Sequence, residues 1–228
     1  MTATISALAH VAEGVELGDD VFVEEFCLVG KHIGSTGAAG GRRGVRTTIG
    51  ASSTLRSHTV LYAGSTIGAR FQTGHHVLVR ELNTIGDDVS IGSLSVVEHH
   101  VNVGDGVRIH SQCFIPEFTV LEPGAWIGPR VTLTNVPFPR CPDVEKCLRG
   151  VHVGRDARVG ANATILPGVR IGARALIGAG AVVTKDVPAN SVVIGTAARP
   201  VKSVDELICP VGLDHRPYPL PPEVESTP

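Results

Sequence analysis

Four polar residues recur at a spacing of 18 in the middle of the chain: Glu81, His99, Glu117 and Asn135. If residues 18 apart lie one above another, two carboxylates, an imidazole and a carboxamide line one edge within hydrogen-bonding reach. A neighbouring carboxylate orients an imidazole and raises its pKa, which is typical of a general base. His100 follows directly and is a second candidate for that base. The pattern predicts a proton-transfer site, although the solvated corners of a repeat would also carry polar residues.

A six-residue repeat produces this spacing. Aliphatic residues return every six positions from Ile49 to Leu133, with Thr73 as the one exception, and the same register runs before and after this block. A period of six excludes an amphipathic helix, whose period is 3.6. We expect each aliphatic side chain to point into a core and glycine-tolerant corners to turn the chain. Three hexads would close one triangular coil, so the sequence predicts about eight coils of parallel strands, stacked roughly 4.8 Å apart.

The composition agrees with a narrow core filled by small aliphatic side chains. Aromatic residues make up 4% of the 228 residues, hydrophobic residues 43% and charged residues 18%. The net charge of −2 provides no general attraction for nucleic acid or for a membrane surface. The sequence shows no membrane-spanning stretch, no signal-peptide pattern and no spacing of its five cysteines that suggests a disulfide framework. We therefore expect a cytoplasmic protein.

The register divides the chain into a domain and a tail. Residues 1–202 are predicted to form the repeat domain, with residues 35–48 and 135–152 as extruded loops. Loops on a rigid solenoid commonly carry function. Residues 203–228 form a tail, in which VDELI is expected to be a short helix followed by Pro-rich coil.

Two further expectations depend on the repeat. If the second loop rejoins the corner that it left, the polar column continues to Pro167 and Lys185. His75 and His76 fall on a different corner, where we expect either solvated side chains or a contact between subunits.

The end of the repeat resembles a known family. Residues 172–202, GARALIGAGAVVTKDVPANSVVIGTAARPVK, are similar to the acyl-CoA-binding end of hexapeptide-repeat acyltransferases, and the wider resemblance covers residues 49–202. It implies an all-β, left-handed parallel β-helix, wound against the usual crossover rule. It also implies that backbone amides hold the pantetheine arm of acetyl-CoA and that cations meet its phosphates. On this chain the cofactor-binding positions would be Gly178, Ala179, Ala181, Thr184, Lys185, Ala197, Arg199 and Lys202.

A second motif resembles one subgroup of this family. Thr134-Asn135, followed by Phe138-Pro139-Arg140, is similar to the N-acetyltransferases of nucleotide-linked amino sugars, although Val136 stands where that subgroup commonly has Asp. The resemblance implies direct acyl transfer to an amine, or to a hydroxyl, in a homotrimer with its active site between subunits. The catalytic residues would be His99 or His100 as the base, Glu81 or Glu117 to orient it, and Asn135 beside the amine.

Two other classes of function remain open. The γ-class carbonic anhydrases share this fold and bind zinc through three histidines, two of them five residues apart, whereas no two of the ten histidines here have that spacing. A non-catalytic scaffold with a degenerate site is the other class. Cys141 and Cys147 could pair or bind metal, but one pair at this spacing is a weak signal. No metal is expected.

Overall fold

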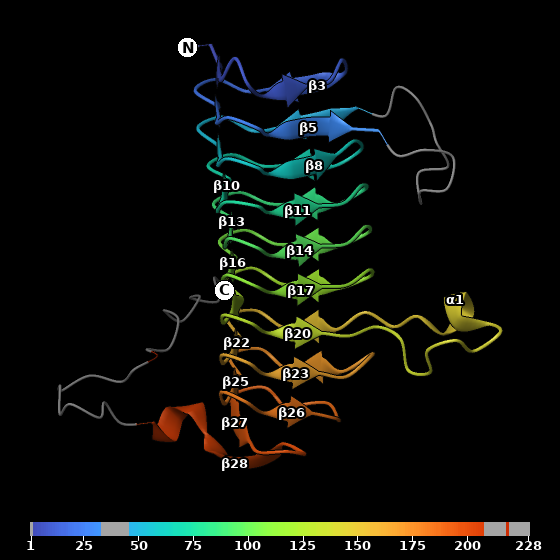
Figure 1. The fold of residues 1–228 in the computed structure, drawn as a ribbon. Coiled ribbons are helices and arrows are strands. Elements are labelled where there is room, and N and C mark those ends of the chain that lie inside the picture. The colour runs from blue at the N-terminus through green and yellow to red at the C-terminus, as the bar shows by residue number, and fades with distance from the viewer. Residues whose placement is uncertain (1, 33–45, 208–217, 219–228) are drawn as a thin grey trace, which may run out of the picture.

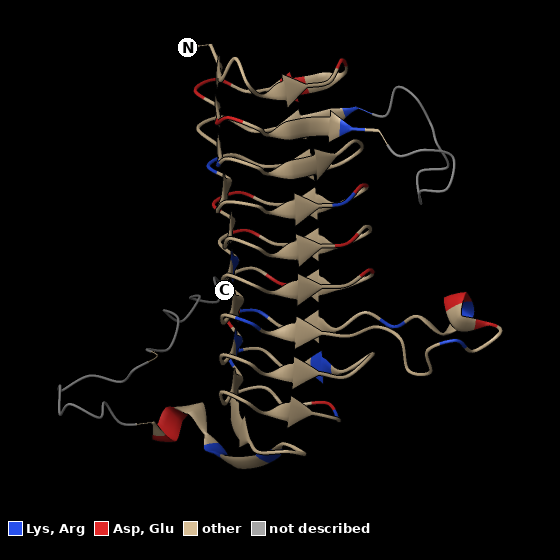
Figure 2. Cartoon of the chain, viewed as in Figure 1, with Lys and Arg blue, Asp and Glu red and all other residues tan. Residues whose placement is uncertain are grey.

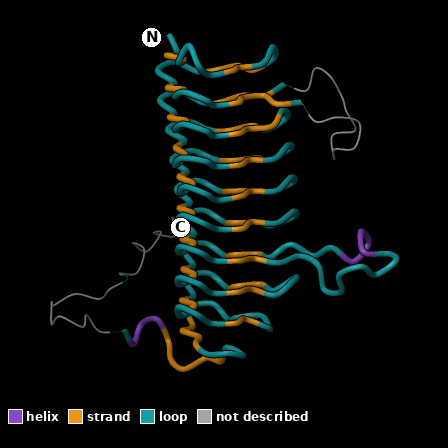
Figure 3. Tube along the Cα trace, viewed as in Figure 1, coloured by secondary structure: helices purple, strands orange, loops and turns teal. Residues whose placement is uncertain are grey.

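The computed structural model describes residues 2–32, 46–207 and 218. These residues form a stack of triangular coils, which Figure 1 shows from the side, with the N-terminal coils at the top. Very short strands alternate with turns throughout the stack (Figure 3). The predicted all-β fold is confirmed, because the helices of the described residues are limited to α1 (Val144–Cys147) and a 3₁₀ turn at Val204–Glu206.

Each coil contributes strands to three sheets, here named sheets A, B and C. The strands of sheet A are β1 (Thr4–Ile5), β4 (Phe22–Val23), β7 (Thr54–Leu55), β10 (Gln72–Thr73), β13 (Ser90–Ile91), β16 (Arg108–Ile109), β19 (Trp126–Ile127), β22 (Arg158–Val159), β25 (Leu176–Ile177), β27 (Ser191–Ile194) and β28 (Arg199–Ser203). The strands of sheet B are β2 (His10–Val11), β5 (Leu28–Lys31), β8 (Val60–Tyr62), β11 (Leu78–Val79), β14 (Val96–Val97), β17 (Phe114–Ile115), β20 (Thr132–Leu133), β23 (Thr164–Ile165) and β26 (Val182–Val183). The strands of sheet C are β3 (Val15–Leu17), β6 (Thr47–Ile49), β9 (Thr66–Ile67), β12 (Thr84–Ile85), β15 (Asn102–Val103), β18 (Val120–Leu121), β21 (His152–Val153) and β24 (Arg170–Ile171).

The pairing of the strands confirms that residues 18 apart in the sequence lie side by side in neighbouring coils. Val79 lies beside Val97 in a parallel ladder, and Val97 lies beside Ile115. Within the described residues, sheet A has 11 strands, of which β28 is antiparallel to its neighbour. The stack therefore has about ten coils rather than about eight. The difference arises because Thr4–Ile5 and Ser191–Ile194 also pair with neighbouring coils.

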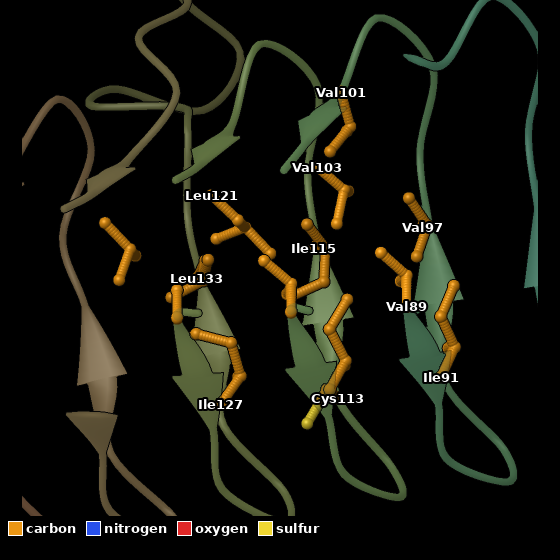
Figure 4. Packing of buried hydrophobic residues seen from close by; sticks show 14 of the residues in the cluster. Val89, Ile91, Val97, Val101, Val103, Cys113, Ile115, Leu121, Ile127 and Leu133 are labelled. Carbon is orange, nitrogen blue, oxygen red and sulfur yellow. The ribbon is translucent and has the colours of Figure 1, made fainter. Parts of the chain in front are cut away.

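The core is a column of small side chains inside the triangle (Figure 4). Each hexad buries its aliphatic residue and the residue four positions later, as Val97 and Val101 do. Ser95, four residues after Ile91, shows how a polar residue at this second position can be satisfied by the next coil. The Ser95 hydroxyl donates to the His110 carbonyl at 3.0 Å and accepts from the Cys113 amide at 3.1 Å. Burial of these two positions in every coil explains how the fold manages with few aromatic residues.

Glycine serves the fold in two ways, and the first is at corners with a positive φ, as the sequence predicted, such as Gly106 at 66°. The residues that turn the chain with a positive φ include His100, at 55°, and Phe118, at 63°, so these corners do not depend on glycine. The glycine that follows the aliphatic residue instead allows two coils to approach. A Cβ atom on Gly92 would lie 2.3 Å from the Ser111 nitrogen of the next coil. Glycine is therefore required at this position by the stacking distance.

Both insertions leave the same edge of the stack, between sheets B and C (Figure 1). The pairs Val15–Thr47 and Val120–His152 step by 32 residues, where other coils step by 18. Most of the predicted loop 35–48 lies outside the described residues, and its last two positions belong to β6 instead. The predicted loop 135–152 also ends too late, because its last residue begins β21. In both cases the last residues of the predicted loop already pair with a strand of the preceding coil, β3 for β6 and β18 for β21, so they belong to the strand.

The end of the described chain follows the prediction in part. After β28, a 3₁₀ turn over Val204–Glu206 lies where a short helix was expected, and Ser203 and Glu206 form its capping box. The Pro-rich segment lies outside the described residues, except for Tyr218. Within the part of the chain that the structure describes, no helix has the length and apolar character needed to span a membrane.

The close approach of coils at glycine leads to a stability prediction. We expect Gly92→Ala to lower the free energy of unfolding by about 1–3 kcal/mol, because the added methyl group forces the coil of Ser111 to move. Urea unfolding followed by circular dichroism measures the change. Ser90→Ala, an outward position on the same coil, is the matched control and is expected to stay within about 0.5 kcal/mol. Equal effects of the two substitutions would contradict the stacking argument.

Candidate functional site

The predicted polar column lies on the edge from which both insertions leave. Glu81, His99, Glu117 and Asn135 each follow a strand of sheet B, namely β11, β14, β17 and β20. We call these four residues and His100 the column. Acidic residues occupy successive turns beyond β11, β14 and β17 in Figure 2. The edge is thus polar over consecutive coils, as the sequence predicted.

Three hydrogen bonds connect four members of the column. The Glu117 carboxylate accepts from His99 Nε2 at 3.1 Å and from Asn135 Nδ2 at 2.5 Å. The Nδ1 atoms of His99 and His100 lie 2.8 Å apart. The resulting line runs from Asn135 through Glu117 and His99 to His100. The spacing of 18 thus brings three of these groups into direct contact, and the neighbouring histidine adds the fourth.

The hydrogen bonds assign protons to the two rings. His99 donates its Nε2 proton to Glu117, so in the neutral ring Nδ1 carries a lone pair. His100 must then donate from Nδ1 to that lone pair, which leaves the lone pair of His100 on Nε2. Among the described residues, Nε2 of His100 has no hydrogen-bond partner, and the ring is exposed and stacks on Phe118 at 5.7 Å. The basic end of the line therefore faces solvent at His100.

Glu81 differs from the rest of the column. The sequence analysis expected this position to point outward, but the Glu81 side chain is 0% exposed and receives two hydrogen bonds from the Arg80 guanidinium, at 2.8 and 3.0 Å. Burial alone would raise the pKa of Glu81, but these hydrogen bonds and the charges of Arg80 and His99 outweigh it and lower the pKa. Glu81 is therefore a buried anion that contributes negative charge near His99 and is not in the hydrogen-bonded line.

Arg80 is a residue that the sequence analysis did not single out as functional. Its guanidinium also meets Glu98 at 3.2 Å and lies 5.3 Å from the Tyr62 ring, which Lys31 approaches at 5.4 Å. The same hydrogen bonds to Glu81 raise the pKa of Arg80. The signal was present, because Tyr62, Arg80 and Glu98 also recur at a spacing of 18. Arg80 holds the acidic side of the site in place.

The site also has the donor set of a weak metal site. One ligand atom each from Glu98, His99 and Glu117 lies within 4.8 Å of the others. Two carboxylates and one imidazole suit a divalent cation. The set differs from the three histidines of the γ-class carbonic anhydrases, and Glu98 and Glu117 are already engaged by Arg80 and Asn135.

The predicted cofactor-binding residues gather in the last coils, where they spread over two corners. Gly178 and Ala179 follow β25, Thr184 and Lys185 follow β26, and the Gly195–Ala198 segment hydrogen-bonds to Val182. The amides of Gly178 and Ala181 already donate to Val193 and Gly178. Arg199 and Lys202 lie exposed on β28, and Ala197 precedes it. The side chain of Ala181 is buried.

The second loop does rejoin the corner that it left. β20 pairs with β23, and β23 pairs with β26, so Asn135, Pro167 and Lys185 follow strands that stack directly. The Arg149 amide closes the loop on the Asn135 carbonyl at 2.9 Å. Lys185 thus lies two coils, about 10 Å, beyond Asn135 along the same edge.

Two other edges carry histidines. On the edge between sheets A and B, a groove of about 430 Å³ includes Arg56, His75, Arg108 and His110 in its lining. On the edge between sheets C and A, His152 Nε2 meets Glu122 at 2.6 Å beside a second groove of about 500 Å³. The hydrogen bond from His152 lowers the pKa of Glu122. The sequence analysis missed this pair because the second loop changes the spacing and because His152 lies beside Val120, two residues before Glu122.

A parallel β-solenoid of six-residue repeats, with a polar column on one edge, defines the class of this protein. A family model described as bacterial transferase hexapeptide (six repeats) matches residues 84–117 and 150–185. Over these residues the chain carries the hexapeptide repeat that its resemblance implied.

Solved structures share the fold at low sequence identity. The UDP-N-acetylglucosamine acyltransferase of Francisella novicida is 20% identical, with a TM-score of 0.61 over 89% of this chain and 71% of that chain. The Arabidopsis UDP-N-acetylglucosamine acyltransferase is 18% identical, with a TM-score of 0.58 over 88% and 74%. The UDP-N-acetylglucosamine O-acyltransferase of Moraxella catarrhalis is 17% identical, with a TM-score of 0.51 over 87% of this chain and 74% of that chain. These neighbours are acyltransferases, and at such identities the likeness establishes the fold.

The lowered pKa of Glu81 predicts a pH-dependent stability. A carboxyl group whose pKa falls on folding stabilises the protein above its unfolded pKa, and that contribution is lost as the pH falls through the folded value. We expect Glu81→Gln to lower the free energy of unfolding by about 1.5–3 kcal/mol at pH 7. The difference from wild type should vanish at a pH below the lowered pKa, under 4.5.

Urea unfolding at a series of pH values measures this difference. Glu145→Gln, at an exposed position of α1, is the control and should leave the stability unchanged at every pH. A Glu81→Gln difference that persists at acidic pH would contradict the ion-pair origin of the effect.

Proposed function

We propose that this protein is an acyl-CoA-dependent acyltransferase that acetylates the amino group of a nucleotide-linked amino sugar by direct transfer from acetyl-CoA. The observation that carries the proposal is the hydrogen-bonded line from Asn135 through Glu117 and His99 to the exposed Nε2 of His100. A carboxylate behind an imidazole pair suits proton removal from an attacking amine. The acyltransferase neighbours and the repeat family agree with this class of reaction.

In the proposed reaction, the amine nitrogen attacks the thioester carbonyl carbon of acetyl-CoA. The C–N bond forms, the C–S bond breaks, and the CoA thiolate leaves. His100 Nε2 takes the amine proton and returns it to the thiolate sulfur. His99 and Glu117 hold His100 in the tautomer that can accept that proton. Asn135 holds Glu117 and lies at the end of the line that faces the donor-binding coils.

The donor site belongs to the last coils in this proposal. Lys185, Arg199 and Lys202 are exposed cations that suit the phosphates of CoA, and Gly178, Ala179, Ala181, Thr184 and Ala197 would lie along its pantetheine arm. Lys185 continues the edge of the column, which favours a donor that runs along this edge toward Asn135.

The acceptor and the assembly follow from the resemblance of Thr134-Asn135 and Phe138-Pro139-Arg140 to amino-sugar N-acetyltransferases. A hydroxyl acceptor is the alternative, in which the same base removes the proton of an alcohol. A homotrimer with its site between subunits belongs to the same proposal, as does a cytoplasmic location beside the acyl-CoA donor.

Separate substitution of the two histidines tests the base. We expect His100→Ala to lower kcat by about 10²–10⁴-fold, the usual contribution of a general base. His99→Ala should lower kcat less and shift the pH profile, because His99 acts through His100. CoA release, followed with a thiol reagent over a panel of nucleotide-linked amino sugars, measures both variants.

His75→Ala, at a different edge, is the control for removal of an exposed imidazole. Loss of kcat in His99→Ala alone would make His99 Nδ1 the base. Full kcat in both variants would contradict histidine base catalysis. Tight binding of acetyl-CoA without turnover of any acceptor would favour a scaffold.

The ligand set of Glu98, His99 and Glu117 favours a metal-dependent hydrolase or hydratase as the second candidate. We expect the purified protein to contain less than stoichiometric zinc and to keep full transferase activity after dialysis against EDTA. Elemental analysis by plasma mass spectrometry and the CoA-release assay measure the two quantities. One zinc per chain that is lost in His99→Ala would support the metal enzyme and overturn the acyl-transfer mechanism given above.

A further inference from the structure

One corner of the solenoid departs from its own pattern at Glu122. In the described coils, the residue that follows each strand of sheet C is glycine, with Glu122 as the exception. These glycines are Gly18, Gly50, Gly68, Gly86, Gly104, Gly154 and Gly172. A Cβ atom on Gly104 would lie 2.6 Å from the Pro123 nitrogen of the next coil, so the stacking disfavours a side chain at this position. The repeat does not require a carboxylate here, and such departures are typical of functional sites.

The next coil engages both oxygens of Glu122. Oε1 accepts from His152 Nε2 at 2.6 Å, and Oε2 accepts from the Arg155 amide at 2.8 Å. The hydrogen bond from His152 is the main cause of the lowered pKa of Glu122, which is therefore ionised at neutral pH. Glu24 caps the Ser57 amide in the same way, at 2.9 Å, and meets no histidine among the described residues. Amide capping thus explains one oxygen of Glu122, whereas the other oxygen fixes the ring of His152.

His152 lines the groove of about 500 Å³ between sheets C and A, which we call the His152 groove. Arg170 lies beside His152 on the neighbouring strand β24. Asp186 follows at the end of sheet C, where its Oδ1 accepts from the Arg170 amide at 2.8 Å. The remaining lining is mostly apolar and includes Ala173, Val187 and Pro188. The groove thus combines charged and apolar residues.

Three polar groups of the groove are without a partner among the described residues. With Nε2 donating to Glu122, Nδ1 of the neutral His152 ring is an acceptor. In the part of the chain that the structure describes, neither this atom nor Asp186 Oδ2 nor the Arg170 guanidinium has a hydrogen-bond partner, and no ion pair joins Arg170 to Asp186. These residues lie on three successive coils, within about 10 Å along the stack. The groove therefore presents two acceptors and one cation that do not satisfy one another.

We propose that the His152 groove binds a zwitterionic amino acid with an apolar side chain. The carboxylate of the ligand accepts from the Arg170 guanidinium, its ammonium group donates to Asp186 and to His152 Nδ1, and its side chain packs against the apolar lining. Glu122 is a positioning residue, which keeps Nδ1 of His152 open to the ligand. A simple anion fits less well, because Glu122 and Asp186 repel it, and a simple cation leaves Arg170 unpaired. The column lies on a different edge, so this inference does not rest on the proposed function.

Nuclear magnetic resonance of histidine-labelled protein tests the ligand. We expect L-valine to shift the ring signals of His152 with a Kd of about 1–10 mM, the range for a ligand of this size. Isovalerate, which lacks the ammonium group, and isobutylamine, which lacks the carboxylate, should bind at least about tenfold more weakly. The variant His152→Gln assigns the signals. No response to L-valine up to about 50 mM, or equal affinity for either analogue, would overturn the proposal.

Substitution of Arg170 tests the carboxylate contact. We expect Arg170→Ala to weaken L-valine binding at least about tenfold, because the carboxylate loses its charged donor. Arg108→Ala, at an outward position of sheet A, is the matched control and should leave the affinity unchanged. Circular dichroism checks that each variant is folded, and Asp186→Asn replaces Arg170→Ala if that variant unfolds. Unchanged affinity in the folded variant contradicts the site.

Substitution of Glu122 tests the positioning of the ring. In wild type we expect the nitrogen shifts of His152 to show the Nε2-protonated tautomer. Glu122→Gln should change these shifts in the free protein and weaken L-valine binding. Glu24→Gln, which alters an amide cap without a histidine, is the control and should change neither quantity. A folded Glu122→Gln protein with the wild-type tautomer and affinity would refute the role of Glu122.

Discussion

The close stacking of one coil on the next is the constraint on which the rest of this protein depends. Parallel ladders fix each residue beside the one 18 positions later, and a glycine after many of the aliphatic residues lets the backbones approach. A Cβ atom on Gly92 would lie 2.3 Å from the next coil, so at this glycine the two backbones lie too close for a side chain. This rigidity turns a one-dimensional repeat into fixed positions for side chains on each edge.

The site follows from that rigidity and from one departure from the repeat. Stacking alone brings His99 to Glu117 and Glu117 to Asn135. The second loop then leaves after Asn135 and returns at Arg149 without breaking the register of sheet B. An insertion of this kind adds surface beside the column at little cost to the ladder, because its ends already lie close together. The solenoid positions the chemistry, and the insertions shape what lies around it.

On the edge between sheets B and C, the charged side chains that are most buried are held by ion pairs. Glu81 is the buried member of the column, where Arg80 keeps it ionised, and Arg80 also holds Glu98. Removal of Arg80 would leave the buried Glu81 carboxylate without this partner. The pKa of Glu81 is lowered even though burial alone would raise it, since the hydrogen bonds to its carboxylate and the charges of Arg80 and His99 together outweigh the loss of hydration. The acidic edge is thus a fixed arrangement, in contrast to the exposed ring of His100.

The sequence by itself determined the fold class, the inward residues and the edge on which the column lies, because a strict period leaves one way to stack the coils. The sequence left open whether the second loop rejoins the corner that it left, and the pairing of β20, β23 and β26 decided it. The tertiary structure decided which way the column residues face: Glu81 is buried behind Arg80, and His100 extends the line from His99. Those outcomes depend on side-chain rotamers and on left-handed corner residues, such as His100 at a φ of 55°, which a six-residue pattern does not encode. The pairing of His152 with Glu122 likewise needed the structure, because an inserted loop separates the two and His152 lies beside Val120, two residues before Glu122.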